Sequence, residues 1–258
     1  MAKRFAKYHG TGNDFILLIS SEELECPEER IIRHACTRHT GIGADGIMIV
    51  CPSEEVDFRV DYYNSDGKLG SLCGNGARCA VHFAQSHGLF EGDSCTFEAA
   101  DGQHDATIDG RGWVTVHFRD VEAGIKENGG LFFQTGSPHL VIETDNLESI
   151  AVEDIGASIR NGAYLEKGGC NVNWVNRNDG VFRMRTYERG VEGETLSCGT
   201  GAVAVALFLH TLHGVPSPIS MVAPGGVLKV AFEKTDAGFN SISLNGPATH
   251  VYNGIWPW

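Results

Sequence analysis

The sequence lacks the features that mark several large classes of protein. Its 258 residues include only 8 Pro and are 42% hydrophobic, which argues against a disordered chain and allows a large buried core. Basic residues are not in excess: the formal net charge is −13, which argues against nucleic acid or a membrane surface as partner. Long apolar runs are missing too, since the longest apolar helical pattern, residues 201–209, is too short to span a bilayer.

Cysteine is present, but never as a CxxC pair. The chain has 8 cysteines, and the closest two are Cys73 and Cys79. This spacing argues against a structural zinc site and a thiol redox protein. The first ten residues have basic side chains but no apolar run behind them, so we expect no signal peptide and a cytoplasmic location. In that compartment thiols stay reduced, and we expect most of the cysteines to be small buried residues.

The chain contains an internal repeat. Segments recur in the same order at a nearly constant offset of 124 residues (134 − 10): GTGNDFILLI with QTGSPHLVIE, FRVDYYN with FRMRTYE, and TFEAADG with SMVAPGG. We interpret the chain as two homologous halves, residues 1–122 and 130–258, joined near the Gly-rich residues 126–130.

Each half is expected to combine β-rich segments with one central helix. Residues 57–64 and 182–188 alternate and are rich in β-forming residues, as strands require. Residues 76–87 and 201–212 carry apolar or small residues on nearly all faces, which is typical of a helix buried on every side. An additional helix is expected around residues 27–38. The predicted class is α/β (α+β): two pseudo-symmetric halves, each a curved, mainly antiparallel sheet or barrel around a central helix, with the active site in a cleft between them.

Two cysteines stand at equivalent places in the repeat. CGNGARC begins at Cys73 and CGTGAVA begins at Cys198, 125 residues later (198 − 73), each at a turn from strand to helix. The glycines leave backbone N–H groups uncovered, and the start of a helix carries unpaired N–H groups and partial positive charge. Such a helix start can bind a carboxylate, and its field favours thiolate over thiol.

A facing pair of these motifs would suit inversion of a stereocentre. One carboxylate would lie between two helix starts, with a thiol or thiolate on each side of the carbon attached to it. Inversion needs a base on one face and an acid on the other, and groups of similar pKa can exchange these roles. The alternative from the residues alone is that duplication copied a structural cysteine at a helix start.

The motifs resemble those of a known family. HGTGNDF, YNSDGKLGSLCGNGARC, GSPH and ERGVEGETLSCGTGA are similar to signatures of the diaminopimelate epimerases. That family has two pseudo-symmetric α/β halves and interconverts LL- and meso-diaminopimelate for lysine and peptidoglycan synthesis. It uses neither pyridoxal phosphate nor metal. The resemblance therefore implies an isomerase with no cofactor and no metal, whose partner is a small amino acid; a homodimer is left open.

The resemblance implies roles for individual residues. Cys73 and Cys198 would be the acid/base pair. Backbone N–H groups at the two helix starts would bind the reacting carboxylate; they belong to Gly74, Asn75, Gly199 and Thr200.

Other side chains would bind the rest of the substrate. Asn13 and Glu188 would hold the reacting ammonium group. Arg189, Asn64 and Asn171 would bind the distal amino-acid end, where a guanidinium can pair with a carboxylate through two hydrogen bonds.

A further histidine and three departures from the family pattern stand near these positions. His139 is expected either near the site or as a buried structural residue. Gly46 stands where many members have Gln, and Ser137 replaces a common Asn. The loop between Glu188 and Cys198 is one residue longer than in many members. These departures concern recognition of the substrate, because they leave both cysteines in place.

Rival functions remain open at this level. A proline or hydroxyproline racemase would also use paired cysteines, but its pocket lacks polar groups for a second amino-acid end. A non-catalytic amino-acid-binding protein would use the helix starts alone, and would exchange no α-proton.

Overall fold

The computed structural model describes residues 4–20, 27–70, 73–178 and 180–257. The chain divides into two compact units: unit 1 comprises residues 1–116 and 247–258, and unit 2 comprises residues 117–246. Both units combine strands and helices, so the fold is mixed α+β, as expected. Within the described residues, no helix combines the length and the apolar character needed to cross a membrane.

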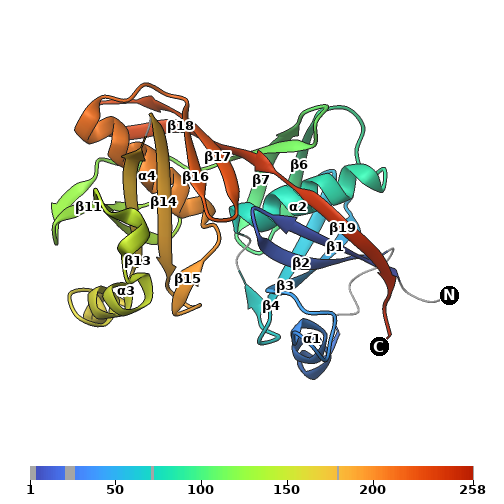
Figure 1. Ribbon diagram of the computed structural model, residues 1–258. Helices are drawn as coiled ribbons and strands as arrows, with labels where there is room; N and C mark the ends of the chain where they lie inside the picture. Colours follow the sequence, from blue (N-terminus) through green and yellow to red (C-terminus); the bar gives the residue numbers. More distant parts are fainter. Residues whose placement is uncertain (1–3, 21–26, 71–72, 179, 258) are drawn as a thin grey trace. The chain divides into compact units, whose positions relative to one another are not determined.

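The strands of unit 1 form a mixed sheet (Figure 1). Their order is β19-β1-β2-β3-β4-β6-β7-β8, with the short β5 beside β4. The strands are β1 (Arg4–Gly10), β2 (Asn13–Ile19), β3 (Gly46–Pro52), β4 (Phe58–Asn64), β5 (Leu69–Gly70), β6 (Ser94–Ala99), β7 (Gly102–Ile108), β8 (Trp113–His117) and β19 (Thr249–Ile255). The helices are α1 (Glu29–Cys36), which packs on β3, and α2 (Gly74–Ser86), which packs on β1, β2, β3 and β7.

Unit 2 has the same plan. Its strand order is β10-β11-β12-β13-β14-β16-β17-β18-β9, with β15 beside β14. The strands are β9 (Val121–Glu122), β10 (Ile125–Glu127), β11 (Gly130–Gln134), β12 (Pro138–Glu143), β13 (Asn171–Asn178), β14 (Val181–Glu188), β15 (Gly193–Thr195), β16 (Ile219–Ala223), β17 (Gly226–Lys234) and β18 (Gly238–Pro247). The helices are α3 (Val152–Asn161), α4 (Gly199–His213) and the short 3₁₀ turns η1 (Leu147–Ser149) and η2 (Leu165–Lys167).

The strand directions repeat between the units. From β1 to β8 the successive pairs are antiparallel, parallel, antiparallel, parallel and then antiparallel. From β11 to β18 the same sequence of pairings recurs, with parallel pairs at β12–β13 and β14–β16. The expectation of two pseudo-symmetric halves with mainly antiparallel sheets is therefore confirmed at the level of topology.

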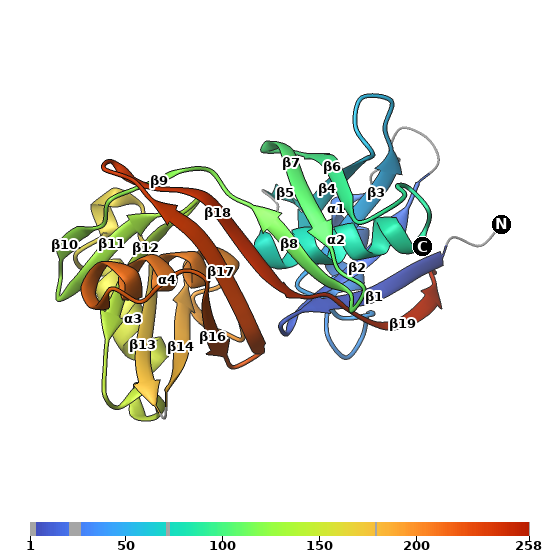
Figure 2. The ribbon, with the colours of Figure 1, turned by 90° about the horizontal axis from the view of Figure 1, so that it is seen from above.

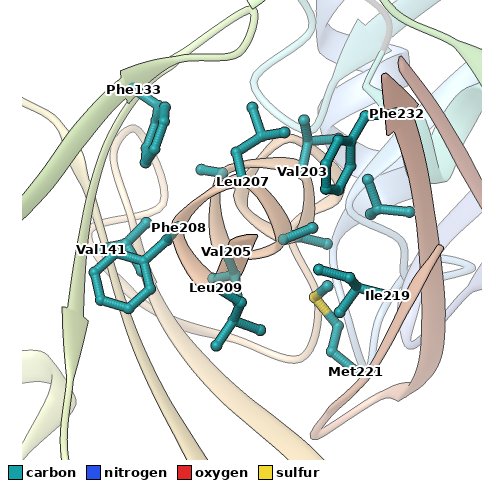
Figure 3. Packing of buried hydrophobic residues seen from close by; sticks show 14 of the residues in the cluster. Phe133, Val141, Val203, Val205, Leu207, Phe208, Leu209, Ile219, Met221 and Phe232 are labelled. Carbon is teal, nitrogen blue, oxygen red and sulfur yellow. The ribbon is translucent and has the colours of Figure 1, made fainter. Parts of the chain in front are cut away.

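The central helices are buried on nearly all sides, as their sequences predict. In α4, every residue from Ala202 to Leu209 is buried. Figure 3 shows α4 side chains such as Leu207 and Phe208 pointing away from the helix in different directions, toward residues of the surrounding strands such as Phe133. The helix ends at Gly214, which adopts a left-handed φ of 64° at the C-cap. Because the first turns of α2 and α4 are also largely buried, both helix starts lie within a close-packed core.

The division into units differs from the sequence-based boundaries at two places. Residues 117–122, expected with the first half, lie in unit 2. Residues 247–258, expected with the second half, lie in unit 1 because β19 pairs antiparallel with β1, as Figure 2 also shows. In unit 2 the corresponding place beside β11 is taken by β10, which forms a hairpin with it. The C-terminal strand therefore completes the edge of the first sheet.

Candidate active site

Cys73 is the N-cap residue of α2. Its Sγ accepts a hydrogen bond of 3.3 Å from the backbone N–H of Gly76, which ties the sulfur to the first turn of the helix. The same Sγ lies 3.7 Å from Oδ1 of Asn13, at the start of β2. The side chain is therefore held between a helix N-terminus, with its partial positive charge, and an amide oxygen.

A fully buried arginine supports this helix start. Arg78 lies one turn into α2 and donates hydrogen bonds to Gly74 O at 3.1 Å, Asn75 Oδ1 at 2.9 Å and Thr11 Oγ1 at 3.2 Å. Burial lowers the pKa of Arg78 to about 10, so the guanidinium is still charged at neutral pH. The arginine thus connects the end of β1 to the residues that follow Cys73.

The amide of Asn13 is oriented by an ionic network. Its Nδ2 donates to Asp45 Oδ2 at 2.6 Å. Arg38 bridges Asp45 and Asp14 at 2.9 Å and 2.6 Å, and Lys7 pairs with Asp14 at 2.7 Å. Burial would raise the pKa of Asp14, but the hydrogen bonds and charges of Arg38 and Lys7 outweigh it and hold that pKa below its usual value. Because a carboxylate only accepts, the Oδ1 end of Asn13 is the end that faces Cys73.

Cys198 is the N-cap residue of α4. Its Sγ lies 3.5 Å from Thr200 Oγ1 in the first turn, and Thr135 Oγ1 donates to Thr200 O at 2.8 Å. Gly201 is required at this helix start, because a Cβ there would lie 2.5 Å from Asn173 Oδ1 on β13. The turn that carries Cys198 is therefore packed directly against polar side chains of the sheet.

His139 lies in the centre of these polar side chains and is fully buried. Its Nε2 is 2.9 Å from Thr200 Oγ1 and 3.3 Å from Asn171 Nδ2, while its Nδ1 is 3.0 Å from Asn173 Nδ2. Burial, and secondarily the positive charge of Arg189, lower the pKa of His139 to about 3. The ring is therefore neutral at physiological pH.

The end of β14 carries the charged residues expected to bind substrate. Glu188 Oε2 accepts a hydrogen bond of 2.9 Å from Thr195 Oγ1. Arg189 is exposed, and its Nη1 donates to Gly168 O at 3.3 Å. Its backbone N–H donates to Asn171 Oδ1 at 2.8 Å, which ties this corner to β13.

Asn64 and Gly46 face each other at the ends of β4 and β3, where they are cross-strand partners. A Cβ at Gly46 would lie 2.4 Å from Tyr62 Cε2 and 2.6 Å from Tyr63 O. The strand backbone and the Tyr62 ring thus fill the place of a side chain at this position. A glutamine, common here in the family that the motifs resemble, would not fit this arrangement.

The structure brings most of the expected site residues into two groups. The first, the Cys73 cluster of unit 1, consists of Cys73, Gly74, Asn75 and Asn13. The second, the Cys198 cluster of unit 2, consists of Cys198, Gly199, Thr200, His139 and Asn171, with Glu188 and Arg189 at its edge. Asn64 belongs to unit 1 and lies across β3 from β2.

Sequence reasoning missed residues that hold these clusters together. Arg78 is the one Asp, Glu, Lys or Arg residue of α2, a helix rich in small and apolar residues, and that contrast was the available signal. Asn173 follows Asn171 by two residues in a strand, so both amides lie on one face of β13. That spacing, beside a parallel strand that begins Pro138-His139, could have indicated a buried polar network.

The remaining described cysteines are buried. Burial raises the pKa of Cys36 and Cys95 to about 12 and that of Cys170 to about 11, and it also raises the pKa of Cys51 and Cys79. Cys26 lies outside the described residues. Among the residues that the structure describes, no group of three or more His, Cys, Asp or Glu side chains could hold a metal ion.

Solved structures share the fold. A *Bacillus anthracis* phenazine biosynthesis protein of the PhzF family aligns with a TM-score of 0.77 at 17% identity, covering 100% of both chains. A hydroxyproline epimerase from *Agrobacterium vitis*, with bound trans-4-hydroxy-L-proline, aligns with a TM-score of 0.68 at 16% identity, covering 98% of this chain and 93% of that one. At these identities the likeness establishes the fold alone.

Sequence comparison is more specific. The family profile described as diaminopimelate epimerase matches residues 5–121 and 131–251. The diaminopimelate epimerase of *Flavobacterium psychrophilum* is 40% identical over 250 residues, covering 95% of this chain and 97% of that protein. The enzyme of the same name from *Chlorobaculum tepidum* is 40% identical over 256 residues, with 95% and 98% covered. The chain therefore belongs to the diaminopimelate epimerase family, and the expectation of an isomerase is confirmed.

Proposed function

We propose that this enzyme interconverts LL- and meso-diaminopimelate, with Cys73 and Cys198 as acid and base and without a cofactor. The observation that carries the proposal is the duplicated helix start. Each of two buried central helices begins at a cysteine, and each sulfur lies beside polar side chains. The reaction would supply meso-diaminopimelate for lysine and peptidoglycan precursor synthesis.

The proton transfers follow from a cysteine on each face of the reacting carbon. A thiolate takes the α-proton, so a C–H bond breaks and an S–H bond forms. The thiol on the opposite face gives up its proton, so a C–H bond of inverted configuration forms and a thiolate remains. The two cysteines have then exchanged protonation states, which is the arrangement that the reverse reaction requires.

Backbone N–H groups stabilise the intermediate charge. When the α-proton leaves, negative charge spreads onto the substrate carboxylate. In α2 the N–H groups of Gly76 and Ala77 are bonded to Cys73, and those of Gly74 and Asn75 would bind the carboxylate. First-turn N–H groups have no acceptor inside their own helix, and fixed donors of this kind stabilise an oxyanion strongly.

At the start of α4, the backbone N–H groups of Gly199 and Thr200 would bind the same carboxylate and stabilise its negative charge.

Binding of substrate groups remote from the reacting carbon gives specificity. Glu188 and Asn13 bind the reacting ammonium group, and Arg189, with Asn64 and Asn171, binds the distal end. The proposal requires the Cys73 cluster and the Cys198 cluster to face one substrate molecule from opposite sides.

Exchange of the α-proton tests the proposal. The enzyme is incubated in deuterated water with diaminopimelate, lysine, glutamate or proline, and deuterium at the α-carbon is measured by mass spectrometry. We expect exchange and epimerisation of diaminopimelate alone. Exchange into proline would assign the enzyme to the rival racemases, and binding of diaminopimelate without any exchange would make it a binding protein.

A further inference from the structure

One face of the sheet in unit 1 carries a row of residues that starts at the Cys73 cluster. Alternate side chains of a strand share a face, so Phe15 lies on the same face of β2 as Asn13, whose Oδ1 is 3.7 Å from Cys73 Sγ. Phe15 is the register partner of Gly46 on β3, and Gly46 is the partner of Asn64 on β4. The row therefore leads from the Cys73 cluster to a residue expected at the distal end of the substrate.

Tyr62 lies in the middle of this row. It precedes Asn64 by two residues in β4, so its side chain points to the same face of the sheet. Its ring makes an edge contact with Phe15, with the ring centroids 5.9 Å apart and the ring planes at 82°. Tyr62 is half-buried, so part of it remains accessible from outside the core.

Two glycines make room for the Tyr62 ring. Gly46 and Gly70 belong to β3 and β5, the strands that pair with this end of β4. The ring atom Cε2 occupies the place that a side chain of Gly46 would take, and Cζ lies 3.0 Å from the same Cβ position. On the other side, Cδ1 and Cε1 lie 3.2 Å from the position of a Cβ at Gly70. The ring therefore lies across both glycines, and the carbon that bears the hydroxyl is on the Gly46 side.

The amide of Asn64 lies beside this ring. Its Nδ2 is 2.5 Å from the position of a Cβ at Gly70, which is the position that the Tyr62 ring also approaches. An amide NH₂ group only donates hydrogen bonds, and a phenol hydroxyl donates one and accepts others. Two neighbouring donors are complementary to the two oxygens of a carboxylate.

The row also has a suitable length for the substrate. β2 and β4 are separated by two strand spacings, roughly 10 Å. Side chains on both strands shorten this gap, and the carbon chain of diaminopimelate can bridge the rest. A chain that reaches from Cys73 to Asn64 passes over Gly46, where the Tyr62 ring lies.

We propose that Tyr62 determines specificity for the distal end of the substrate: its hydroxyl donates a hydrogen bond to the distal carboxylate, beside Asn64. The inference rests on the proposed function and adds to it a substrate-binding residue that the motifs did not identify. Because a carboxylate accepts from several donors, this contact is compatible with the one proposed for Arg189.

Tyr62→Phe tests the role of the hydroxyl, because it keeps the ring that packs on Phe15. Calorimetric titration gives the dissociation constants of three ligands. They are an equilibrated mixture of LL- and meso-diaminopimelate, α-aminopimelate, which lacks the distal amino group, and lysine, which lacks the distal carboxylate. We expect Tyr62→Phe to weaken binding of the first two by about tenfold to a hundredfold and to leave lysine unchanged.

Tyr63→Phe is the matched control. Tyr63 points to the opposite face of β4, where it belongs to the apolar cluster that includes Ile32 of α1. This variant should leave the three dissociation constants as they are in the parent.

Three results for Tyr62→Phe would overturn the inference. Diaminopimelate could bind as it does to the parent. Lysine could lose as much affinity as diaminopimelate, in which case the hydroxyl acts away from the distal carboxylate. Diaminopimelate and lysine could weaken while α-aminopimelate does not, which would assign the hydroxyl to the distal amino group.

The same measurements separate this inference from the proposed function, because binding is measured whether or not a proton is exchanged. If the parent exchanges the α-proton of diaminopimelate and Tyr62→Phe binds it like the parent, only this inference fails. If Tyr62→Phe shows the expected losses and the parent exchanges no α-proton, only the proposed function fails.

Discussion

Arg78 donates a hydrogen bond of 2.9 Å to Asn75 Oδ1 from a guanidinium that is fully buried. Replacing it by Met keeps much of the volume but leaves Gly74 O and Thr11 Oγ1 without this donor. We expect a loss of about 3 kcal/mol in the free energy of unfolding, because buried polar groups that lose their partner are costly. Urea denaturation measures it. Arg30→Met is the control, because its ion pair with Glu28 is exposed and should matter little; equal losses in the two variants would refute the role of Arg78.

Gly201 is close to Asn173, and a methyl group at this position has no room. The Cβ of Gly201→Ala would lie 2.5 Å from Asn173 Oδ1 and 3.2 Å from Cys198 Cβ. We expect destabilisation by about 1–3 kcal/mol together with reduced turnover, since the start of α4 must shift. Gly110→Ala is the matched control because nothing lies within 4 Å of a Cβ there. A stable and fully active Gly201→Ala would show that the helix start is less tightly constrained.

The buried neutral His139 predicts a pH dependence of stability. Its pKa is lowered from 6.5 to about 3 in the folded protein, mainly by burial. Between these values the unfolded chain binds a proton that the native chain does not, so stability is present above pH 6.5 and is lost as pH falls. The contribution is about 1.4 kcal/mol per pH unit at most.

Urea denaturation at several pH values should therefore show a shallower acid slope for His139→Gln than for the parent. His213→Gln serves as the control, because His213 is partly exposed beside Glu143. Identical slopes in His139→Gln and the parent would mean that the buried ring takes up its proton near the ordinary pKa.

Arg189 should determine recognition of the distal end of the substrate. Arg189→Ala removes a charge that has no part in the proton transfers, so we expect kcat/KM for diaminopimelate to fall by an amount on the order of 2–5 kcal/mol. Arg183→Ala, an exposed arginine on the same strand, is the control. If Arg189→Ala keeps the specificity of the parent, another group must bind the distal carboxylate.

Local patterns predicted much of the fold. The helix at residues 201–212 and the strand at 57–64 are found at α4 and β4, because periodicity and β-propensity report burial within one segment. The pairing of β19 with β1 was not predictable in this way. It joins the two ends of the chain, and nothing in residues 249–255 identifies a partner more than two hundred residues away.

For the candidate site, too, the local features were predictable from the sequence and the tertiary contacts were not. The glycines after Cys73 and Cys198 marked both helix starts, since their local chemistry is visible in the sequence. The contacts of Arg78 and Asn173 were not visible, because they depend on which strands pack beside each helix. In physical terms, a motif specifies the reacting group, whereas the tertiary packing specifies the hydrogen bonds that orient it.

The central claim is that both cysteines move protons. It is tested most directly with β-halogenated diaminopimelate, from which a single base can eliminate halide after removing the α-proton. Cys73→Ala and Cys198→Ala are assayed for epimerisation of diaminopimelate and for halide release from each configuration of the analogue, with Cys95→Ala as a control for loss of a buried cysteine.

We expect both active-site variants to lose epimerisation by several orders of magnitude while Cys95→Ala retains it. We also expect the two variants to release halide from opposite configurations, because each keeps a base on one face only. Epimerisation nearly intact in either variant, or the same configurational preference in both, would contradict the two-cysteine mechanism.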